Sequence, residues 1–272
     1  MQMLVKVCCP LCKSVHSRHW ASENGFTAVK CANCGFVYLN PRPPNECIDE
    51  KNKIGFHGTK SDTFRSLKIL RTHKVHEFKR RITPILHDMG LTDKKIDWLD
   101  VGAGSGELLY ALKTLLPTCT CAGIEPSRPK IATAIKYHIN IADLTIDQIN
   151  QKYDVISLIN VFSHLPEPVE FILKLKSRLK QNGFLILVTG NGGDVPPLEY
   201  PDSFFFPDHL VFAGETHILR LLDDCGFSII SLKKYRYFIQ ESMMIRLLKS
   251  ILGGHSLFNR GPFRSMWIVA QI

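Results

Sequence analysis

The sequence predicts an α/β protein with a parallel sheet, preceded by a small metal-binding module. Two observations predict the sheet: a glycine-rich turn joins an apolar strand to a helix at residues 102–106, and a second strand ends at Glu125, about one βαβ unit later. A third observation predicts the module, since two Cys-x-x-Cys pairs lie near the start of the chain. The 272 residues, 45% of them hydrophobic, suffice for one α/β domain and a smaller appendage.

The cysteine pairs are Cys9 with Cys12 and Cys31 with Cys34, separated by 18 residues. Each pair makes a tight turn that aims two thiolates at one point, and two such turns complete a tetrahedron, so the spacing predicts a Zn²⁺ site. Four thiolates leave no open coordination position, which makes this zinc structural. Cys8 competes with Cys9, but its longer spacing from Cys12 fits the turn less well. Four unrelated buried cysteines are the alternative.

A basic helix is predicted between the module and the sheet. Apolar residues recur at helical spacing from about Ser61 to Leu86, with Ser61 or Asp62 as the N-cap and an end around Pro84. Residues 1–95 hold 17 Lys and Arg against 8 Asp and Glu, whereas residues 96–272 hold 17 of each kind. The formal excess of +9 therefore precedes the sheet, where it attracts an anionic partner or forms a solvated helix face.

The glycine-rich turn predicts a cofactor site. Residues 96–101 read as a short apolar strand and residues 107–112 open a helix, with Gly102, Gly104 and Gly106 between them. Glycine removes the Cβ that would hold a ligand away from the backbone and permits φ > 0. The next strand, residues 119–124, ends at Glu125, whose carboxylate is placed to accept both hydroxyls of a ribose.

The spacing of the glycines separates two adenosine-bearing cofactors. A nicotinamide fingerprint, G-x-G-x-x-G, would place glycine at position 107, where this chain has Glu107. A carboxylate there suits a pyrophosphate badly, but it suits a sulfonium, which is positively charged and carries no phosphate. The turn therefore favours S-adenosylmethionine (SAM) over NAD.

Residues 99–106, Leu-Asp-Val-Gly-Ala-Gly-Ser-Gly, resemble motif I of class I SAM-dependent methyltransferases, and residues 123–127 resemble their second motif. Residues 153–160 are similar to the family's fourth strand and residues 161–168 to the segment after it, with Ser163 in place of the usual Glu. Residues 179–188 resemble the turn and fifth strand. The resemblance implies a Rossmann-like class I methyltransferase sheet.

The combination of cysteine ribbon, Asn-Pro-Arg-Pro exit at residues 40–43 and class I core resembles bacterial methyltransferases of sugar, polysaccharide or secondary-metabolite pathways. Those proteins more often have glycine where this chain has Lys13. The predicted organisation is a zinc-ribbon-like module at residues 1–40, a basic linker and helix at 41–95, and a SAM-dependent methyltransferase domain at 96–272.

Backbone approach and the resemblance together predict the cofactor contacts. The glycine loop meets the cofactor, and the resemblance implies that Asp100 positions this loop and the methionine amino group. Asn160, at the end of the fourth strand, is expected to touch the methionine moiety. Asp143, after the third strand, is a candidate for the adenine amine, with an ordinary helix cap as its alternative. The predicted cofactor-binding residues are Asp100, Gly102, Ala103, Gly104, Gly106, Glu125, Asp143 and Asn160.

Methyl transfer requires an acceptor held in line with the sulfonium and, for a hydroxyl or a carbon acid, a base. His164 lies just past the fourth strand, at the edge where ligands bind in open α/β sheets. His209 comes from the loop after the fifth strand and resembles the family's P-x-H-L stretch. Both are predicted catalytic residues. The alternatives are that His164 bonds a backbone carbonyl and that His209 anchors its loop.

Two further segments are predicted around the acceptor. The loop from Gly190 through Phe206 is long for an α/β connection, which is typical of a segment that covers the acceptor. Its three consecutive Phe residues, 204–206, suggest an apolar wall or burial against the core. Apolar residues at helical spacing between Met244 and Ile251 precede a last strand at residues 265–270.

Two motifs that the sequence lacks argue against methylation of nucleic-acid bases. The fourth strand does not end in the Pro-Pro motif that holds the exocyclic amine of a base, and no Pro-Cys nucleophile follows it. The predicted function is methyl transfer from SAM to an oxygen or carbon of a small acceptor such as a sugar nucleotide or another anionic metabolite. One alternative is an RNA methyltransferase, although Phe78 is the only aromatic residue in the basic run 71–81. The other is a non-catalytic SAM-binding scaffold.

The location of the protein is predicted from what the sequence lacks. No stretch approaches the ~20 apolar residues of a membrane span, and no apolar signal-peptide core precedes Cys8. The nine cysteines are therefore expected to stay reduced in a cytoplasm. The sequence leaves the oligomeric state open, and a further interpretation of the ribbon is that it shapes the acceptor pocket from outside the core.

Overall fold

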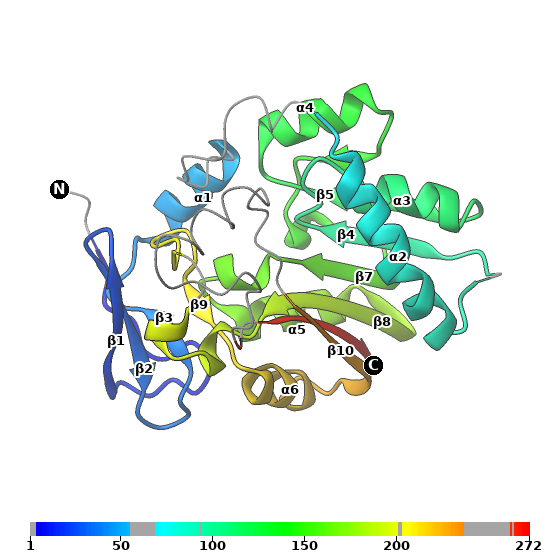
Figure 1. Ribbon diagram of the computed structural model, residues 1–272. Coiled ribbons are helices and arrows are strands. Elements are labelled where there is room, and N and C mark those ends of the chain that lie inside the picture. The colour runs from blue at the N-terminus through cyan, green and yellow to red at the C-terminus, as the bar shows by residue number, and fades with distance from the viewer. Residues whose placement is uncertain (1–3, 55–68, 93, 201–202, 237–261, 263) are drawn as a thin grey trace, which may run out of the picture.

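The computed structural model describes residues 4–54, 69–92, 94–200, 203–236, 262 and 264–272. Its main sheet has seven strands in the order β10-β11-β8-β7-β4-β5-β6 (Figure 1). The strands β4 to β8 pair in parallel, and β11 and β10 complete the sheet in antiparallel orientation. These strands are β4 (Asp97–Val101), β5 (Thr120–Ile124), β6 (Ile141–Ala142), β7 (Tyr153–Ile159), β8 (Leu179–Gly190), β10 (Ser228–Arg236) and β11 (Arg264–Gln271). The Rossmann-like α/β prediction is confirmed.

Successive residues of each central strand enter different cores on the two faces of the sheet. Trp98 and Val155 belong to the core beneath α2, α3 and α4, whereas Leu99 and Ile156 belong to the core beneath α5 and α6. The result is a three-layer arrangement with helices on both faces. The helices are α1 (Asn45–Ile54), α2 (Thr72–Asp88), α3 (Glu107–Leu115), α4 (Arg128–Lys136), α5 (Pro168–Ser177) and α6 (Glu215–Asp224).

The helix α2 corrects the predicted basic helix at both ends. It continues through Pro84 to Asp88, because Ile85 and Leu86 extend its buried stripe beyond the proline and their packing outweighs one lost hydrogen bond. It begins only at Thr72, since residues 69–71 are not helical and Arg71 has an extended backbone with ψ 98°. The predicted N-cap at Ser61 or Asp62 and the apolar stretch at 244–251 lie outside the described residues.

The N-terminal module is a second sheet of four strands in the order β1-β2-β3-β9. The hairpin β1 (Ser17–Glu23) and β2 (Phe26–Cys31) turns through Asn24 and Gly25, whose φ values of +51° and +79° suit a two-residue Asn-Gly loop. The strand β3 (Val37–Leu39) then pairs with β9 (Val211–Phe212), which comes from the loop after β8. The module therefore shares a sheet with the rest of the chain.

Figure 1 shows this small sheet on the side toward which the arrow of β7 points. Its buried residues, such as Phe36 and Leu39, belong to the same core as Leu99 and Leu210. The module thus lies against the carboxyl edge of the parallel strands, where ligands bind in open α/β sheets. Among the residues that the structure describes, no helix has the length and apolarity needed to cross a bilayer.

Candidate functional site

The glycine loop between β4 and α3 combines two tight positions with one open position. Gly102, Gly104 and Gly106 have φ values of +71°, +59° and +88°. A Cβ on Gly102 would lie 2.3 Å from Val161 Cγ2, and a Cβ on Gly106 would lie 2.8 Å from Ile139. Among the residues that the structure describes, a Cβ on Gly104 would meet only Glu107 Oε2, at 3.9 Å. The outer glycines therefore serve packing, while the space above Gly104 is available to a ligand.

Glu125 follows β5 and is 4% exposed. One carboxylate oxygen accepts the backbone N–H of Gly104 at 2.9 Å, and the other accepts the N–H of Ser127 at 3.1 Å. Lys130 Nζ lies 3.6 Å from the second oxygen. Because a carboxylate oxygen has two lone pairs, each oxygen retains capacity for a hydroxyl donor after these contacts. The carboxylate is thus fixed beside the glycine loop, as a ribose-binding group requires.

Asp100 is buried in β4, one residue before the end of the strand, and is connected to a short hydrogen-bond chain. Trp98 Nε1–H donates to Ser157 Oγ at 2.9 Å, and the Ser157 hydroxyl donates to Asp100 Oδ1 at 2.6 Å. Burial raises the pKa of Asp100 to about 7, opposed by the Ser157 hydrogen bond and reinforced by the charges of Glu125 and Glu107. Three buried carboxylates therefore surround the loop, an arrangement that favours a cation.

Glu107, the third of these carboxylates, opens α3 and is 3% exposed. Its Oε1 lies 2.7 Å from Arg71 Nε, in an ion pair that joins α3 to the residue preceding α2. In the sequence, Glu107 served only to discriminate between cofactors, and Arg71 had no predicted role. Their pairing depends on the packing of two helices, so no local sequence signal indicates it.

The remaining predicted cofactor residues lie at the carboxyl edge of the sheet. Ala103 is buried, and its N–H donates to Ile124 O at 3.0 Å. Asn160, directly after β7, is exposed with φ +55°. Asp143, directly after β6, is also exposed. Their positions suit the predicted contacts, which stay predictions.

The structure brings His164 and His209 together around Asp208, a residue that was not predicted from the sequence. His164 Nδ1 lies 3.0 Å from the backbone O of Asp208 and 3.6 Å from its Oδ2. The two imidazole rings are 5.0 Å apart between centroids. One nitrogen of each ring and a carboxylate oxygen of Asp208 lie within 4.8 Å of one another. Sequence adjacency to His209 was the only signal that pointed to Asp208.

Two contacts place this histidine cluster (His164, Asp208 and His209) beside the glycine loop. Leu210 N–H donates to Ser163 O at 2.7 Å, which joins the 203–210 loop to the 3₁₀ turn η3 (Phe162–His164). Val161, immediately before that turn, occupies the space next to Gly102. The cluster and the loop are therefore neighbours at the end of β7.

The histidine ring nitrogens have distinct roles. A carbonyl oxygen only accepts hydrogen bonds, so Nδ1 of His164 carries the proton that it donates to Asp208 O. In the neutral ring Nε2 is then the basic nitrogen. Lys51 Nζ lies 3.3 Å from the other carboxylate oxygen, Asp208 Oδ1.

The four predicted metal ligands converge. Their Sγ atoms all lie within 4.8 Å of one another, with 3.6 Å between Cys9 and Cys34 and 3.5 Å between Cys12 and Cys31. Zn–S bonds of about 2.3 Å in a tetrahedron separate neighbouring sulfurs by about 3.8 Å, so the donor set fits Zn²⁺. Cys8 is exposed and is not part of this group.

The two cysteine turns have the same backbone form. Lys13 N–H donates to Cys9 O at 2.8 Å, and Gly35 N–H donates to Cys31 O at 3.0 Å. Lys13 and Gly35 have φ values of +60° and +76°. Lys13 thus takes the left-handed position that glycine takes in the second turn, and its Nζ pairs with Glu167 at 2.9 Å.

Two residues of the β1–β2 hairpin connect the module to the loop that carries His209, and one further contact connects the module to α6. Glu23 of β1 accepts the backbone N–H groups of Phe204 and Phe206, both at 3.0 Å, and the Ser203 hydroxyl at 2.8 Å. Asn24 donates to Phe206 O. His217 of α6 bonds Cys34 O through Nε2 at 2.9 Å. The module therefore helps to position the histidine cluster.

The run of three Phe residues divides between two surroundings. Phe206 is 3% exposed and stacks on Phe204, with 5.3 Å between ring centroids. Phe204 also packs against Trp20 of the module at 5.1 Å. Phe205, with φ +61°, contacts His209 at 5.5 Å. Phe204 and Phe206 therefore pack in or against the core, whereas Phe205 lies beside the histidine cluster.

Comparison with known proteins places these features in context. A protein-family model described as "Methyltransferase domain" matches residues 73–232. The ubiquinone biosynthesis O-methyltransferase of Rickettsia canadensis (strain McKiel) is 29% identical over 140 residues, which cover 48% of this chain and 57% of that protein. The chain thus spans about half the length of the curated relatives it matches.

Solved structures share the fold. Magnesium protoporphyrin IX methyltransferase from Synechocystis PCC 6803, with bound SAH, superposes with a TM-score of 0.53 and 18% identity, covering 84% of this chain and 98% of that one. A cyclopropane synthase from Mycobacterium tuberculosis gives a TM-score of 0.53 and 15% identity, covering 71% of this chain and 84% of that one.

Proposed function

The chain belongs to the methyltransferase-domain family, and from this premise we propose that it transfers the methyl group of SAM to an oxygen atom of a small acceptor. The observation that carries the proposal is the position of the histidine cluster beside the glycine loop, through Val161 and the turn that follows it. The curated relatives named O-methyltransferases support oxygen as the acceptor atom.

The groups around the glycine loop would hold the cofactor. The open space above Gly104 admits a ligand close to the backbone, and the fixed carboxylate of Glu125 suits the ribose hydroxyls. Asp100 and Glu107 supply negative charge that favours the cationic methionine end. When bound, SAM supplies an electrophilic methyl group on its sulfonium. The chain's contribution is to bind and orient this group.

His164 is proposed as the base. Its Nδ1–H is held by Asp208 O, so Nε2 takes the proton of the acceptor hydroxyl as the oxygen forms its bond to the methyl carbon. The Asp208 carboxylate, 3.6 Å from Nδ1, stabilises the imidazolium that results. The His209 ring packs against His164 and is proposed to line the acceptor pocket.

We further propose that Cys9, Cys12, Cys31 and Cys34 hold a structural Zn²⁺. Four thiolates complete a tetrahedral site, so the metal takes no part in the transfer. Its effect on the site is indirect: it orders the small sheet, which supplies Glu23 and β3 as partners for residues 203–212. This arrangement supports the interpretation that the ribbon shapes the acceptor pocket from outside the core.

The test is SAH release from the purified zinc protein with SAM and a panel of phenols, catechols and hydroxylated sugar phosphates. His164→Gln and His209→Gln should each lower turnover with the accepted substrate while SAH affinity is retained. His19→Gln, at an exposed position on β1, is the matched control and should turn over like the parent. Full activity of the doubly substituted protein would refute the catalytic assignment.

A further inference from the structure

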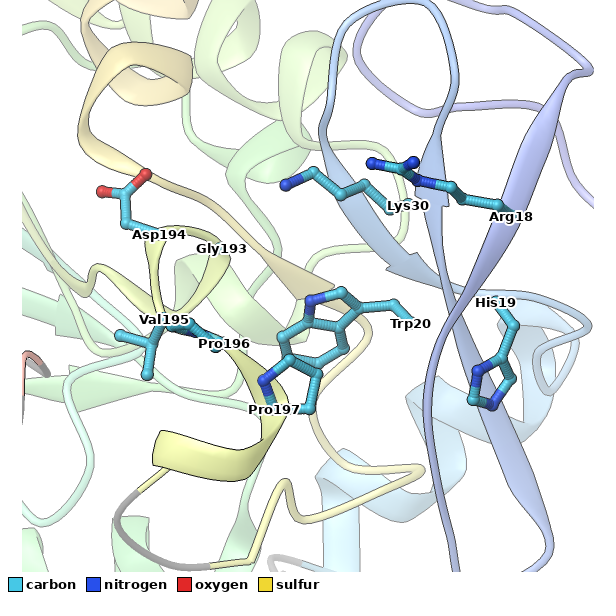
Figure 2. A pocket seen from close by; sticks show the side chains of 9 residues that line it. All are labelled: Arg18, His19, Trp20, Lys30, Gly193, Asp194, Val195, Pro196 and Pro197. Carbon is cyan, nitrogen blue, oxygen red and sulfur yellow. The ribbon is translucent and has the colours of Figure 1, made fainter.

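A pocket of about 360 Å³ lies between the β1–β2 hairpin and the segment after β8 (Figure 2), and no described residue of the glycine loop or the histidine cluster belongs to its lining. The segment contains the 3₁₀ turns η4 (Gly192–Asp194) and η5 (Pro197–Glu199). This volume is within the range of small-ligand sites. The lining residues are Arg18, His19, Trp20, Lys30, Gly193, Asp194, Val195, Pro196 and Pro197.

Two cations face each other across the hairpin. Arg18 and Lys30 are direct partners in the β1–β2 register, and like charges directly opposite each other on paired strands are destabilising. Figure 2 shows both side chains extending toward the same side of the hairpin, into the space before residues 193–197. Within the described part of the chain, neither has a carboxylate at ion-pair distance. The pair therefore presents two positive charges that an anion would relieve.

An aromatic and proline wall lies next to these charges. Trp20 is half-buried and lines the pocket together with Pro196 and Pro197. The ring is held from behind by Phe204 at 5.1 Å and Phe212 at 5.5 Å between centroids. A fixed indole next to proline rings suits a flat ring of a ligand. His19 also belongs to the lining, and its Nε2 lies 3.0 Å from Ser22 Oγ.

One carboxylate, Asp194, is among the described residues of the lining, and its charge is engaged elsewhere. Its Oδ2 accepts the backbone N–H of Glu215 at 2.8 Å, at the N-terminus of α6. A helix N-terminus carries partial positive charge, which offsets a carboxylate placed there. The net charge of the described lining residues therefore remains positive.

We propose that this pocket binds a ring compound that carries a phosphate group. A phosphate monoester has a charge of about −1.5 to −2 at pH 7, which matches two cations, whereas a carboxylate matches one. The Arg18 guanidinium offers paired N–H donors to phosphate oxygens, and Lys30 adds a second positive charge. The ring then stacks on Trp20. This site goes beyond the proposed methyl transfer, and its test requires no turnover.

The probe is phenyl phosphate, followed by tryptophan fluorescence of the zinc-loaded protein. Trp98 and Trp267 are 0% and 4% exposed, so a ligand-dependent change reports Trp20. Saturable binding with a Kd of about 1 mM is expected for a ligand of this size. Inorganic phosphate lacks the ring, phenol lacks the charged group, and benzoate carries a carboxylate in place of the phosphate. Each should bind at least about fivefold more weakly than phenyl phosphate. Equal binding of benzoate or inorganic phosphate would overturn the assignment.

The pocket variant is Arg18→Gln with Lys30→Gln, and Lys79→Gln with Arg80→Gln on α2 is its charge-matched control. The pocket variant should weaken phenyl phosphate binding at least about tenfold, while the control changes it less than about twofold. Removal of two opposed cations should also leave the pocket variant at least as heat-stable as the parent in phosphate-free buffer. Equal weakening in both variants would show non-specific attraction and refute the site.

Lys30 directly precedes Cys31, so its substitution could disturb the zinc site. A second variant therefore leaves Lys30 unchanged. Arg18→Gln alone changes an exposed side chain of β1, on the strand that carries no cysteine, and should retain zinc. It should still weaken phenyl phosphate binding, by about fivefold. Unchanged affinity in this variant, or no saturable signal from the parent protein up to about 20 mM, would overturn the proposal.

Discussion

Glu125 accepts the backbone N–H of Gly104 at 2.9 Å, so the end of β5 holds the middle of the glycine loop from 21 residues away. The contact aligns Gly104 with the carboxylate expected to take the ribose, and a Cβ on Gly104 would clash with none of the described residues. Together with the N–H groups of Gly102 and Ala103, which both donate to Ile124 O, this contact joins the loop to the end of β5.

Gly104→Ala should weaken cofactor binding beyond its effect on stability. A Cβ at this position enters the ligand space, and its φ of +59° costs about 1 kcal/mol for a non-glycine residue. Gly25→Ala is the matched control, because Gly25 lies in the hairpin turn with φ +79° and a Cβ there would meet no atom of the described residues within 4 Å. Thermal unfolding should show similar losses for both variants. Calorimetry should show at least about tenfold weaker SAH binding for Gly104→Ala alone, and equal affinities would contradict the account.

Asp100→Asn should stabilise the cofactor-free protein at neutral and alkaline pH. Burial raises the pKa of Asp100 from 3.8 to about 7, so its contribution to stability is complete below pH 4 and is lost as the pH rises through about 7. Asparagine cannot ionise, and urea unfolding at pH 8 should favour the variant by ~2–4 kcal/mol, with a smaller difference at pH 5. Asp49→Asn, at an exposed site on α1, should follow the parent at both pH values. Parallel pH profiles for Asp100→Asn and the parent would contradict the prediction.

The zinc assignment predicts one tightly held Zn²⁺ per chain. Cys9→Ser should abolish it and lower the midpoint of thermal unfolding, because Cys9 is buried and anchors the first turn through Lys13. Cys8→Ser, which changes the exposed neighbour, should retain both the metal and the stability. Elemental analysis of the purified proteins provides the measurement. A zinc-free parent protein, or metal loss in Cys8→Ser, would show that the ligand set is wrong.

The parts of the site that could be predicted from sequence are those specified by neighbouring residues. Gly106 caps α3 in the left-handed region three residues after Ala103, and the signal for this turn is contained in one short stretch. The cysteine turns are equally local, since each closes within five residues. Lys13 shows that the turn, rather than glycine itself, is what the fold requires there.

The histidine cluster depends on contacts that sequence spacing does not encode. His164 and Asp208 meet because Leu210 bonds Ser163 and because Phe212 pairs with Val37, which lies far earlier in the chain. Each pairing arises from packing of the 203–212 loop between two sheets. The two histidines could therefore be predicted separately from the sequence, but the carboxylate between them could not.

The errors in α2 have the same origin. Local rules place a helix end at Pro84, but Ile85 and Leu86 pack in the core beneath α2 and α3 and carry the helix onward. At the other end, Arg71 has an extended backbone and its side chain pairs with Glu107, which follows the glycine loop. Tertiary contacts outweighed local propensity at both ends.

The measurement that tests the central claim most directly is calorimetric titration of the zinc-loaded protein with SAH, with Glu125→Gln as the variant and Glu170→Gln, on the exposed face of α5, as the control. The account predicts micromolar binding to the parent and to Glu170→Gln, and at least about tenfold weaker binding to Glu125→Gln, because the neutral amide offers the ribose hydroxyls a single oxygen. Absence of binding to the correctly folded parent, or equal affinity in Glu125→Gln, would contradict it.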